Sequence, residues 1–177
     1  GEIRWCQGYS EPGAGSDLAG VQTKGVDKGD YFEVTGQKIW TSYADQADWI
    51  FCLVRTEPDA PKHKGISFLL FDMASEGVST KPIQLISGAS PFCETFFDAV
   101  KVPVDQIVSD RGNGWTVAKY LLTHEREMIG SSDAALFGSE DVVDVARDAV
   151  GLNEDGVLRD PMLRARLAEF LVEEQAF

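Results

Sequence analysis

The stretch from Gly8 to Gly20 has the residue types of a ligand-binding loop. Glycines and a proline follow one another closely in it, and Ser10 and Ser16 add hydroxyl groups. Glycine leaves backbone N–H groups open to an approaching ligand, and N–H groups that converge in a loop bind anions. The same composition also occurs in loops that only turn the chain, so the residues alone leave both interpretations open. No helical pattern follows the glycines, which excludes the strand–loop–helix fingerprint of a dinucleotide site.

A second stretch, from Gly36 to Ala44, places Trp40 two residues before Ser42. Residues two apart in a strand lie on the same side, so the indole ring and the hydroxyl group would face the same ligand. This pair suits a flat heteroaromatic cofactor, whose face stacks on the indole while the hydroxyl donates to a nitrogen at its edge. The alternative is that Trp40 belongs to the hydrophobic core.

The composition and charge of the chain exclude several classes of protein. Of its 177 residues, 44% are hydrophobic and 25% are charged, which is typical of a folded domain and not of a disordered or fibrous chain. The 16 basic residues stand against 29 acidic ones, and the resulting net charge of −13 repels nucleic acids and anionic membranes. We therefore expect no nucleic-acid partner and no membrane partner.

Cysteine and histidine are too few and too scattered for a disulfide framework or a metal site. Cys6, Cys52 and Cys93 form no CxxC pair, and His63 and His124 are the only histidines. The sequence has no pattern of a signal peptide and no apolar run long enough to cross a membrane. We expect a reduced cytoplasmic protein without a metal, or a mitochondrial matrix protein if the source is eukaryotic.

Up to about residue 108, short apolar or alternating runs separated by turn residues predict strands. The pairs Gly29-Asp30 and Thr35-Gly36 stand between such runs at hairpin spacing and predict two tight turns. Short strands at this interval are typical of an antiparallel sandwich or barrel. The charged segment from Glu57 to Gly65 is predicted to be an exposed loop that includes His63. The predicted strands are Val21–Val26, Tyr31–Val34, Gln37–Trp40, Trp49–Arg55, Ile66–Phe71, Val78–Ile83 and Glu94–Val100.

From Gly112 onward the apolar residues recur at intervals of three and four, which is typical of amphipathic helices. We expect one long helix, interrupted near Gly138. A second helix should follow with Asp160 as its N-cap and Pro161 in its first turn.

The predicted fold class is therefore α+β. An antiparallel β-barrel or sandwich domain over residues 1–110 is followed by the α-helices of an incomplete helical-bundle domain over residues 111–177. The chain begins with glycine and ends at Phe177 inside a helical pattern, so we expect both ends to be cut.

The order and spacing of these stretches resemble the acyl-CoA dehydrogenase family of flavoproteins over nearly the whole chain. The loop and the tryptophan stretch are followed by further segments that are similar to those of the family. These segments are Ala47–Trp49, Gly65–Phe68, Phe96–Pro103, Gly112–Trp115 and His124–Arg126. The run Cys6–Gly13, together with the His-Glu-Arg helix, also looks like the branch of pimeloyl-CoA dehydrogenase large subunits.

The resemblance implies that FAD lies against a middle β-barrel domain. Tyr9 and Ser10 would contact the flavin, and Gly15 and Ser16 would lie where the cofactor meets the CoA arm of the substrate. The segment Trp40–Ser42 would complete the cofactor site. In it the indole packs on the isoalloxazine, Thr41 lies beside it, and the hydroxyl of Ser42 donates towards the reactive N5. One departure is that Tyr9 stands where the family usually has a small aliphatic residue.

The resemblance also implies a base and a cation for the substrate. In most of the family the catalytic carboxylate lies beyond the position of Phe177, but a minority place a glutamate directly before an arginine on the first C-terminal helix. Glu125 and Arg126 match that minority pattern, with Glu125 as the base and Arg126, together with Ser16, as contacts for acyl-CoA. An ion pair with a neighbouring side chain is the alternative role for both residues.

The function implied is FAD-dependent α,β-dehydrogenation of an acyl-CoA thioester to the 2-enoyl-CoA. An electron-transferring flavoprotein would accept the electrons, and the enzyme would form homo- or hetero-oligomers, as dimers or tetramers. The alternatives are a relative of acyl-CoA oxidases or nitroalkane oxidases, in which oxygen reoxidises the flavin, and a non-catalytic partner subunit or binding module.

Overall fold

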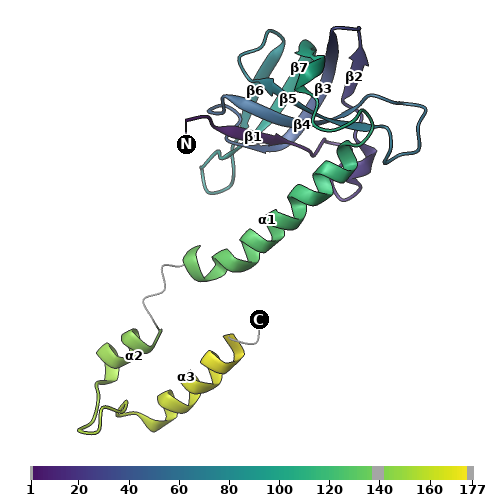
Figure 1. Cartoon of the computed structure of the whole chain (residues 1–177). Coiled ribbons are helices and arrows are strands. Elements are labelled where there is room, and N and C mark those ends of the chain that lie inside the picture. Colours follow the sequence, from purple (N-terminus) through teal and green to yellow (C-terminus); the bar gives the residue numbers. More distant parts are fainter. Residues whose placement is uncertain (1, 137–141, 175–177) are drawn as a thin grey trace. The chain divides into compact units, whose positions relative to one another are not determined.

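The computed structural model describes residues 2–136 and 142–174. By its internal contacts the chain divides into two compact units, Gly1–His124 and Glu125–Phe177, and each is described by itself. The first unit holds all the strands and the first turns of a helix, and the second unit is helical (Figure 1). The strands are β1 (Trp5–Gly8), β2 (Lys24–Asp27), β3 (Tyr31–Ser42), β4 (Trp49–Arg55), β5 (Ile66–Asp72), β6 (Val78–Ile83) and β7 (Phe92–Pro103). The α-helices are α1 (Gly114–Leu136), α2 (Val142–Val150) and α3 (Pro161–Glu174).

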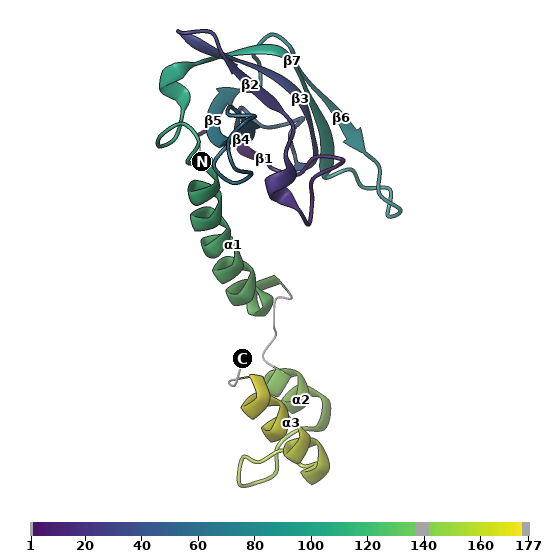
Figure 2. The ribbon, with the colours of Figure 1, turned by 90° about the vertical axis from the view of Figure 1, so that its right-hand side faces the viewer.

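The strands form one curled sheet in the order β1-β4-β2-β3-β7-β6, with β5 paired to the other side of β4. Figure 2 shows the curl, with β2, β3, β7 and β6 in one wall and β1, β4 and β5 in the other. The predicted α+β fold, a curled β domain followed by helices, is confirmed. The expectation of a purely antiparallel sheet needs one correction, because β1 and β2 both run parallel to β4. A parallel pair requires a long crossover connection, and the loop after β1 together with the β2–β3 hairpin supplies it here.

The turn between β2 and β3 was predicted correctly, and the one predicted at Thr35-Gly36 was not. Gly29 has a φ of +96°, and the N–H of Lys28 donates to the carbonyl of Tyr31 at 2.9 Å. Gly36 instead lies inside the continuous strand β3, where the pairing with β7 shifts register. A Cβ at Gly36 would stand 2.7 Å from the Cα of Thr23, so glycine marks a close backbone approach and not a turn.

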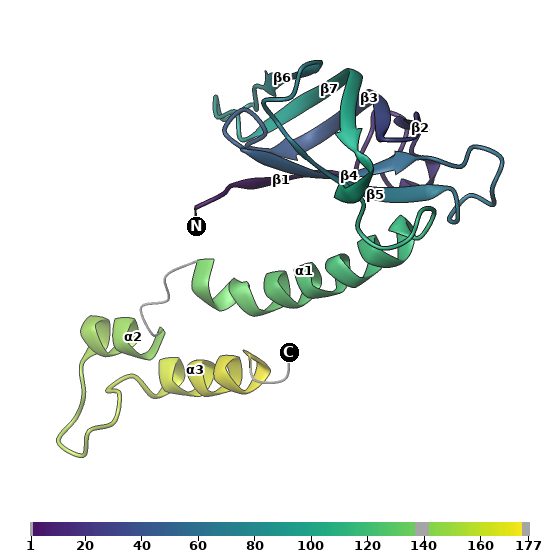
Figure 3. The ribbon, with the colours of Figure 1, turned by 45° about the horizontal axis from the view of Figure 1, so that its top comes forward.

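Two groups of apolar side chains fill the first unit. One group lies between the walls of the sheet and includes Phe32, Ile50 and Val100. The other includes Phe68 of β5 and Ala118 of α1 and lies where the first turns of α1 pack on β5 (Figure 3). Gly114 allows this packing, because a Cβ there would stand 2.5 Å from the backbone of Ser67.

The second unit contains the predicted start of α3. The carboxylate of Asp160 accepts hydrogen bonds from the N–H groups of Met162, at 2.9 Å, and Leu163, at 3.0 Å. These bonds confirm Asp160 as the N-cap of a helix that begins at Pro161. The predicted interruption near Gly138 and the chain end at Phe177 lie outside the described residues. Among the helices that are described, none is both long and apolar enough to span a membrane.

Candidate functional site

A buried ion pair anchors the glycine-rich loop to strand β3. The Nζ of Lys38 lies 2.8 Å from Oε1 of Glu11, and the side chains are 0% and 8% exposed. The same ammonium donates to the carbonyl of Tyr9 at 3.1 Å. The carboxylate of Glu11 also accepts the N–H groups of Gln22, at 2.6 Å, and Thr23, at 2.9 Å. Three segments that are distant in sequence are therefore joined around one pair of charges.

The surroundings of Glu11 keep it ionised. Burial alone would raise the pKa of this carboxyl group, but the positive charge of Lys38 and the hydrogen bonds from Lys38, Gln22 and Thr23 outweigh it. The net effect is a pKa below its ordinary value of 4.5. At neutral pH the carboxyl group of Glu11 is therefore ionised.

The loop turns sharply after Glu11 and exposes its backbone. Reciprocal hydrogen bonds of 2.9 and 3.0 Å join the backbones of Glu11 and Ala14, which are both buried. Gly13, Gly15 and Ser16 are exposed, and their N–H groups make no hydrogen bond within the described part of the chain. No atom lies within 4 Å of where a Cβ of Gly13 or Gly15 would stand. The turn thus presents open donors and free space on its outer side.

Strand β3 turns Trp40 and Ser42 outward at an irregularity in the sheet. Its register with β7 shifts between Lys38 and Thr41, and Trp40 has a φ of +62°, in a region that bulky residues rarely adopt. As a result Trp40 is 54% exposed and Ser42 is also exposed, whereas Thr41 is fully buried. The alternative prediction that Trp40 belongs to the hydrophobic core is therefore wrong.

The structure brings the two predicted stretches together at Ser10. The N–H of Ile39 donates to the carbonyl of Ser10 at 2.9 Å, so the loop lies directly beside the strand that carries Trp40 and Ser42. Thr41 does not face outward, and its buried hydroxyl has no hydrogen-bond partner among the described residues. Side chains of Ser10, Trp40 and Ser42 are thus available around this point, while Thr41 offers only its backbone.

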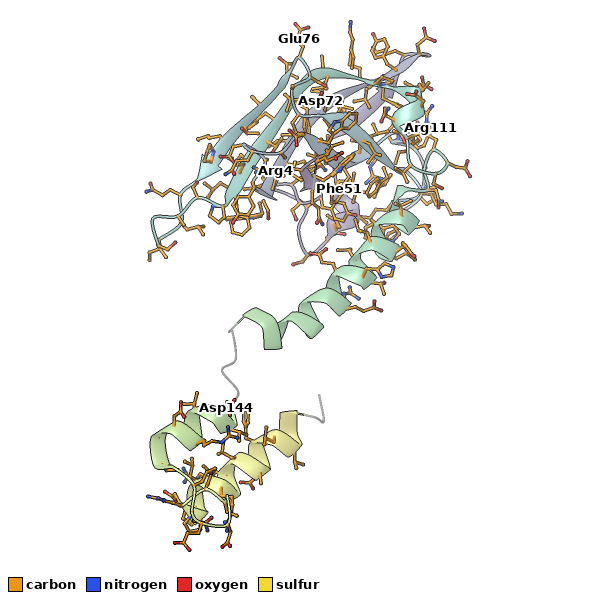
Figure 4. The ribbon with its side chains drawn as sticks, turned by 60° about the vertical axis from the view of Figure 1, so that its left-hand side comes forward. Arg4, Phe51, Asp72, Glu76, Arg111 and Asp144 are labelled. Carbon is orange, nitrogen blue, oxygen red and sulfur yellow. The ribbon has the colours of Figure 1, made fainter. Side chains whose placement is uncertain are left out.

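The ring of Tyr9 points into the core and away from the loop surface. It is 4% exposed and meets the rings of Phe51 and Phe68 edge-on, with centroid distances of 6.0 and 6.2 Å. Figure 4 labels Phe51 at the base of the curled sheet. A ligand on the loop surface could reach Tyr9 only through its backbone, which is how the structure accommodates an aromatic residue at this position.

At its other end the loop meets the segment from Glu57 to Gly65. Asp17 forms an ion pair with Lys62, and the guanidinium of Arg55 donates to the carbonyls of Ala19, at 2.7 Å, and Lys62, at 2.7 Å. The part of the loop from Asp17 to Ala19 is therefore held against this segment. The predicted exposure of His63 in the segment is confirmed, and its ring centroid lies 4.9 Å from that of Trp115.

A pocket of about 520 Å³ opens beside Ser42, within the size range of small-molecule sites. Neither Trp40 nor the glycine-rich loop contributes to it, so the pocket adjoins the site and does not contain it. Its walls are Arg4, Trp5, Ser42, Tyr43, Gln46 and Ala47.

The three cysteines are buried and free. Burial raises the pKa of Cys6 to about 12 and that of Cys52 to about 11, so these thiols stay protonated at neutral pH. They supply no nucleophile. In the described part of the chain no three side chains of histidine, cysteine, aspartate or glutamate are grouped as metal ligands.

Glu125 and Arg126 lie in the second unit, on α1. Glu125 is half-buried and Arg126 is exposed, and neither forms an ion pair with any residue that the structure describes. Adjacent helical residues point about 100° apart, so the two side chains face different directions. Among the residues that the structure describes, the ion pair that was the alternative role for both is not seen.

Sequence reasoning missed Glu11, Lys38 and Arg55, which hold the loop in place. A signal for Lys38 was present, because Phe32 and Val34 alternate along β3 and Lys38 continues the same inward-facing series. No comparable pattern identified Glu11 or Arg55, whose partners are distant in sequence.

Comparison with known proteins gives a consistent assignment. The family model described as "Acyl-CoA dehydrogenase, middle domain" matches residues 6–100. Acyl-CoA dehydrogenase IpdE1 of Mycobacterium tuberculosis is 41% identical over 92% of this chain and 41% of its own length. Acyl-CoA dehydrogenase FadE34 of the same organism is 45% identical over 84% of this chain and 21% of its own length.

A solved structure agrees with these relatives. The Tcur3481-Tcur3483 steroid ACAD superimposes with a TM-score of 0.78 at 40% identity, covering 99% of this chain and 44% of that chain. The chain spans less than half the length of the relatives that it matches. The match over residues 6–100 and the identity to these relatives show that the chain belongs to the acyl-CoA dehydrogenase family.

Proposed function

We propose that this chain forms the flavin-facing part of a longer acyl-CoA dehydrogenase, which converts an acyl-CoA thioester to the 2-enoyl-CoA. The observation that carries the proposal is the exposed pair Trp40 and Ser42 beside the open turn after Ser10. An aromatic plane, two hydroxyl groups and free backbone donors are the groups that a flavin with phosphate arms requires. The residues present therefore fit FAD.

Each residue of the site would have a separate task. Trp40 would stack on the face of the flavin ring, and the hydroxyl of Ser42 would donate to its edge. Ser10, held beside Ile39, would contact the same ring from the loop. The N–H groups of Gly15 and Ser16 would bind phosphate oxygens where cofactor and substrate meet. When bound, FAD accepts the hydride that leaves the β carbon of the thioester.

Removal of the α proton needs a base, and Glu125 is the candidate that this chain contains. A half-buried carboxylate on a helix can serve as a base, and Arg126 next to it would bind the phosphates of CoA. The alternative is a carboxylate elsewhere in the full-length protein.

The name of a relative supports a bulky acyl group. The Tcur3481-Tcur3483 protein is described as a steroid ACAD and is 40% identical to this chain. We therefore expect a CoA thioester with a steroid-type acyl group to be a better substrate than pimeloyl-CoA or a straight-chain thioester. An electron-transferring flavoprotein would then reoxidise the enzyme.

A partner-subunit role is the second candidate function. A similar structure, of 30% identity and TM-score 0.72, is the ChsE4-ChsE5 complex from Mycobacterium tuberculosis, which contains two different proteins. In such an assembly one chain could hold the fold and another the complete active site.

Anaerobic mixing of the full-length protein with CoA thioesters tests the proposal. Loss of the visible flavin absorbance with formation of the 2-enoyl-CoA is the expected result, fastest with the steroid-type thioester. Rapid reoxidation by oxygen alone would favour the oxidase alternative. A purified protein that binds no flavin, alone or with a co-expressed partner, would contradict the proposal and favour a binding module.

A further inference from the structure

We propose that Glu11 and Lys38 are positioning residues for the flavin site, which set the place of Ser10 relative to Trp40 and Ser42. The inference rests on the proposed function, because it concerns the same site. Neither side chain would touch the cofactor, since Lys38 is 0% exposed and Glu11 is 8% exposed.

Lys38 forms hydrogen bonds to the residues directly before and after Ser10. Its ammonium holds the carbonyl of Tyr9 at 3.1 Å and the carboxylate of Glu11 at 2.8 Å, and these are the two neighbours of Ser10 in the chain. The carbonyl of Ser10 itself accepts the N–H of Ile39, the residue after Lys38, at 2.9 Å. Three consecutive loop residues are thus fixed to two consecutive residues of β3.

The same lysine stands at the start of the irregularity that exposes Trp40. Lys38 pairs with Thr95 of β7, and the register shift follows before Thr41. The hydrogen bonds of Lys38 therefore connect the loop to the last regular position of the strand. Loss of these bonds would let Ser10 move relative to the indole ring and the hydroxyl of Ser42.

The other hydrogen bonds of Glu11 connect it to the residues that follow the loop, Gln22 and Thr23. Its second carboxylate oxygen accepts the N–H of Gln22 at 2.6 Å, and Thr23 donates to the first oxygen at 2.9 Å. Both ends of the glycine-rich loop are consequently held by one carboxylate. The exposed turn between them can then carry open N–H groups without losing its shape.

The energetics favour a role in positioning over a role in stability. Two charges lose their hydration on burial, and apolar residues of similar size often stabilise a core equally well. A buried pair gives a defined geometry that interchangeable apolar contacts do not, because its hydrogen bonds are directional. We therefore attribute the presence of a buried ion pair here, in place of apolar side chains, to its effect on the position of the loop.

The test uses the full-length protein with the double variant Glu11→Gln/Lys38→Met, in which no unpaired charge remains. We expect the apoprotein to stay folded and its dissociation constant for FAD, measured by flavin fluorescence, to rise at least about tenfold. The Ile39 amide should exchange its hydrogen faster, which is a readout that needs no flavin. Glu11→Gln alone leaves the buried ammonium of Lys38 without its counter-charge, so FAD affinity and Ile39 protection should fall at least as much as in the double variant.

Val102→Ala is the matched control, because it removes buried methyl groups from β7 at a distance from the loop in sequence. Even if Val102→Ala lowers the melting temperature as much as the double variant does, it should leave FAD binding and Ile39 exchange unchanged. Wild-type FAD affinity and Ile39 exchange in the double variant would overturn the positioning role while leaving the proposed function intact. Equal weakening by Val102→Ala would also overturn it. Failure of the wild-type protein to bind FAD would refute the proposed function and this role with it.

Discussion

At the scale of residues, the candidate site is built around Trp40, whose backbone and side chain are both unusual. Its φ of +62° and its 54% exposure are each unfavourable for a large aromatic residue in a strand. Such backbone strain costs about 1–3 kcal/mol and persists where the surrounding structure imposes it, often at functional sites. A ligand that covers the indole ring would explain why it is held outward.

Replacement of Trp40 by alanine should weaken FAD binding to the full-length protein by about tenfold, because the stacking area is lost. Titration of the apoprotein with FAD measures the effect. Tyr120→Ala, which removes an exposed ring from α1, is the control and should leave the affinity unchanged. Equal affinity of Trp40→Ala and wild type would exclude stacking on this residue.

Replacement of Ser42 by alanine should act on the reaction more than on binding. A hydrogen bond that strengthens in the transition state contributes to the rate, so flavin reduction by substrate should slow by about 10²-fold with FAD still bound. Stopped-flow measurement without oxygen gives this rate. An unchanged rate would show that the hydroxyl of Ser42 does not donate to the reacting edge.

Replacement of Glu125 by glutamine tests the base. If Glu125 takes the α proton, flavin reduction should fall by about 10²-fold or more while FAD remains bound. Glu127→Gln, two residues further along α1, is the control. A near wild-type rate for Glu125→Gln would assign the base to another part of the full-length protein.

At the scale of elements, β3 shows what the sequence could predict and what it could not. The spacing of Trp40 and Ser42 predicted that the two side chains share one side of the strand, and both are exposed. The irregularity at Trp40 depends on pairing with β7, which no local pattern encodes. Gly36 was misinterpreted for the same reason, since the approach of Thr23 becomes visible only in three dimensions.

The short strand β1 and its parallel pairing were also beyond prediction. Only Cys6 and Gly8 of its four residues are buried, which is too short a pattern to identify a strand. The candidate site with Ser10, Trp40 and Ser42 could be proposed from sequence motifs. The ion pair between Glu11 and Lys38 could not be predicted, because these two residues are 27 positions apart.

The contribution of the Glu11–Lys38 ion pair to the free energy of unfolding should depend on pH. Since the pKa of Glu11 is lower in the folded protein than its ordinary value of 4.5, the pair stabilises the fold fully above that value. Its contribution is lost as the pH falls through the folded pKa. The difference in free energy of unfolding between wild type and Glu11→Gln, from urea titrations, should therefore shrink below pH 4.5. A difference that stays constant with pH would contradict the depressed pKa.

At the scale of the whole molecule, the residues proposed to face the flavin all come from the first compact unit, whereas Glu125 and Arg126 come from the second. The relatives are more than twice as long as the stretch that they share with this chain. The proposed function accordingly belongs to the full-length protein. In that protein this chain would contribute one face of the cofactor site.

The structure of the full-length protein with FAD bound is the most direct test of this account. The flavin ring should stack on Trp40, with the two ring centroids about 4.5–7 Å apart as is usual for aromatic pairs. The hydroxyl of Ser42 should lie within about 3.2 Å of a nitrogen at the edge of the ring. A flavin bound on another surface, such as the pocket lined by Lys24, Arg55 and Arg111, would contradict the account.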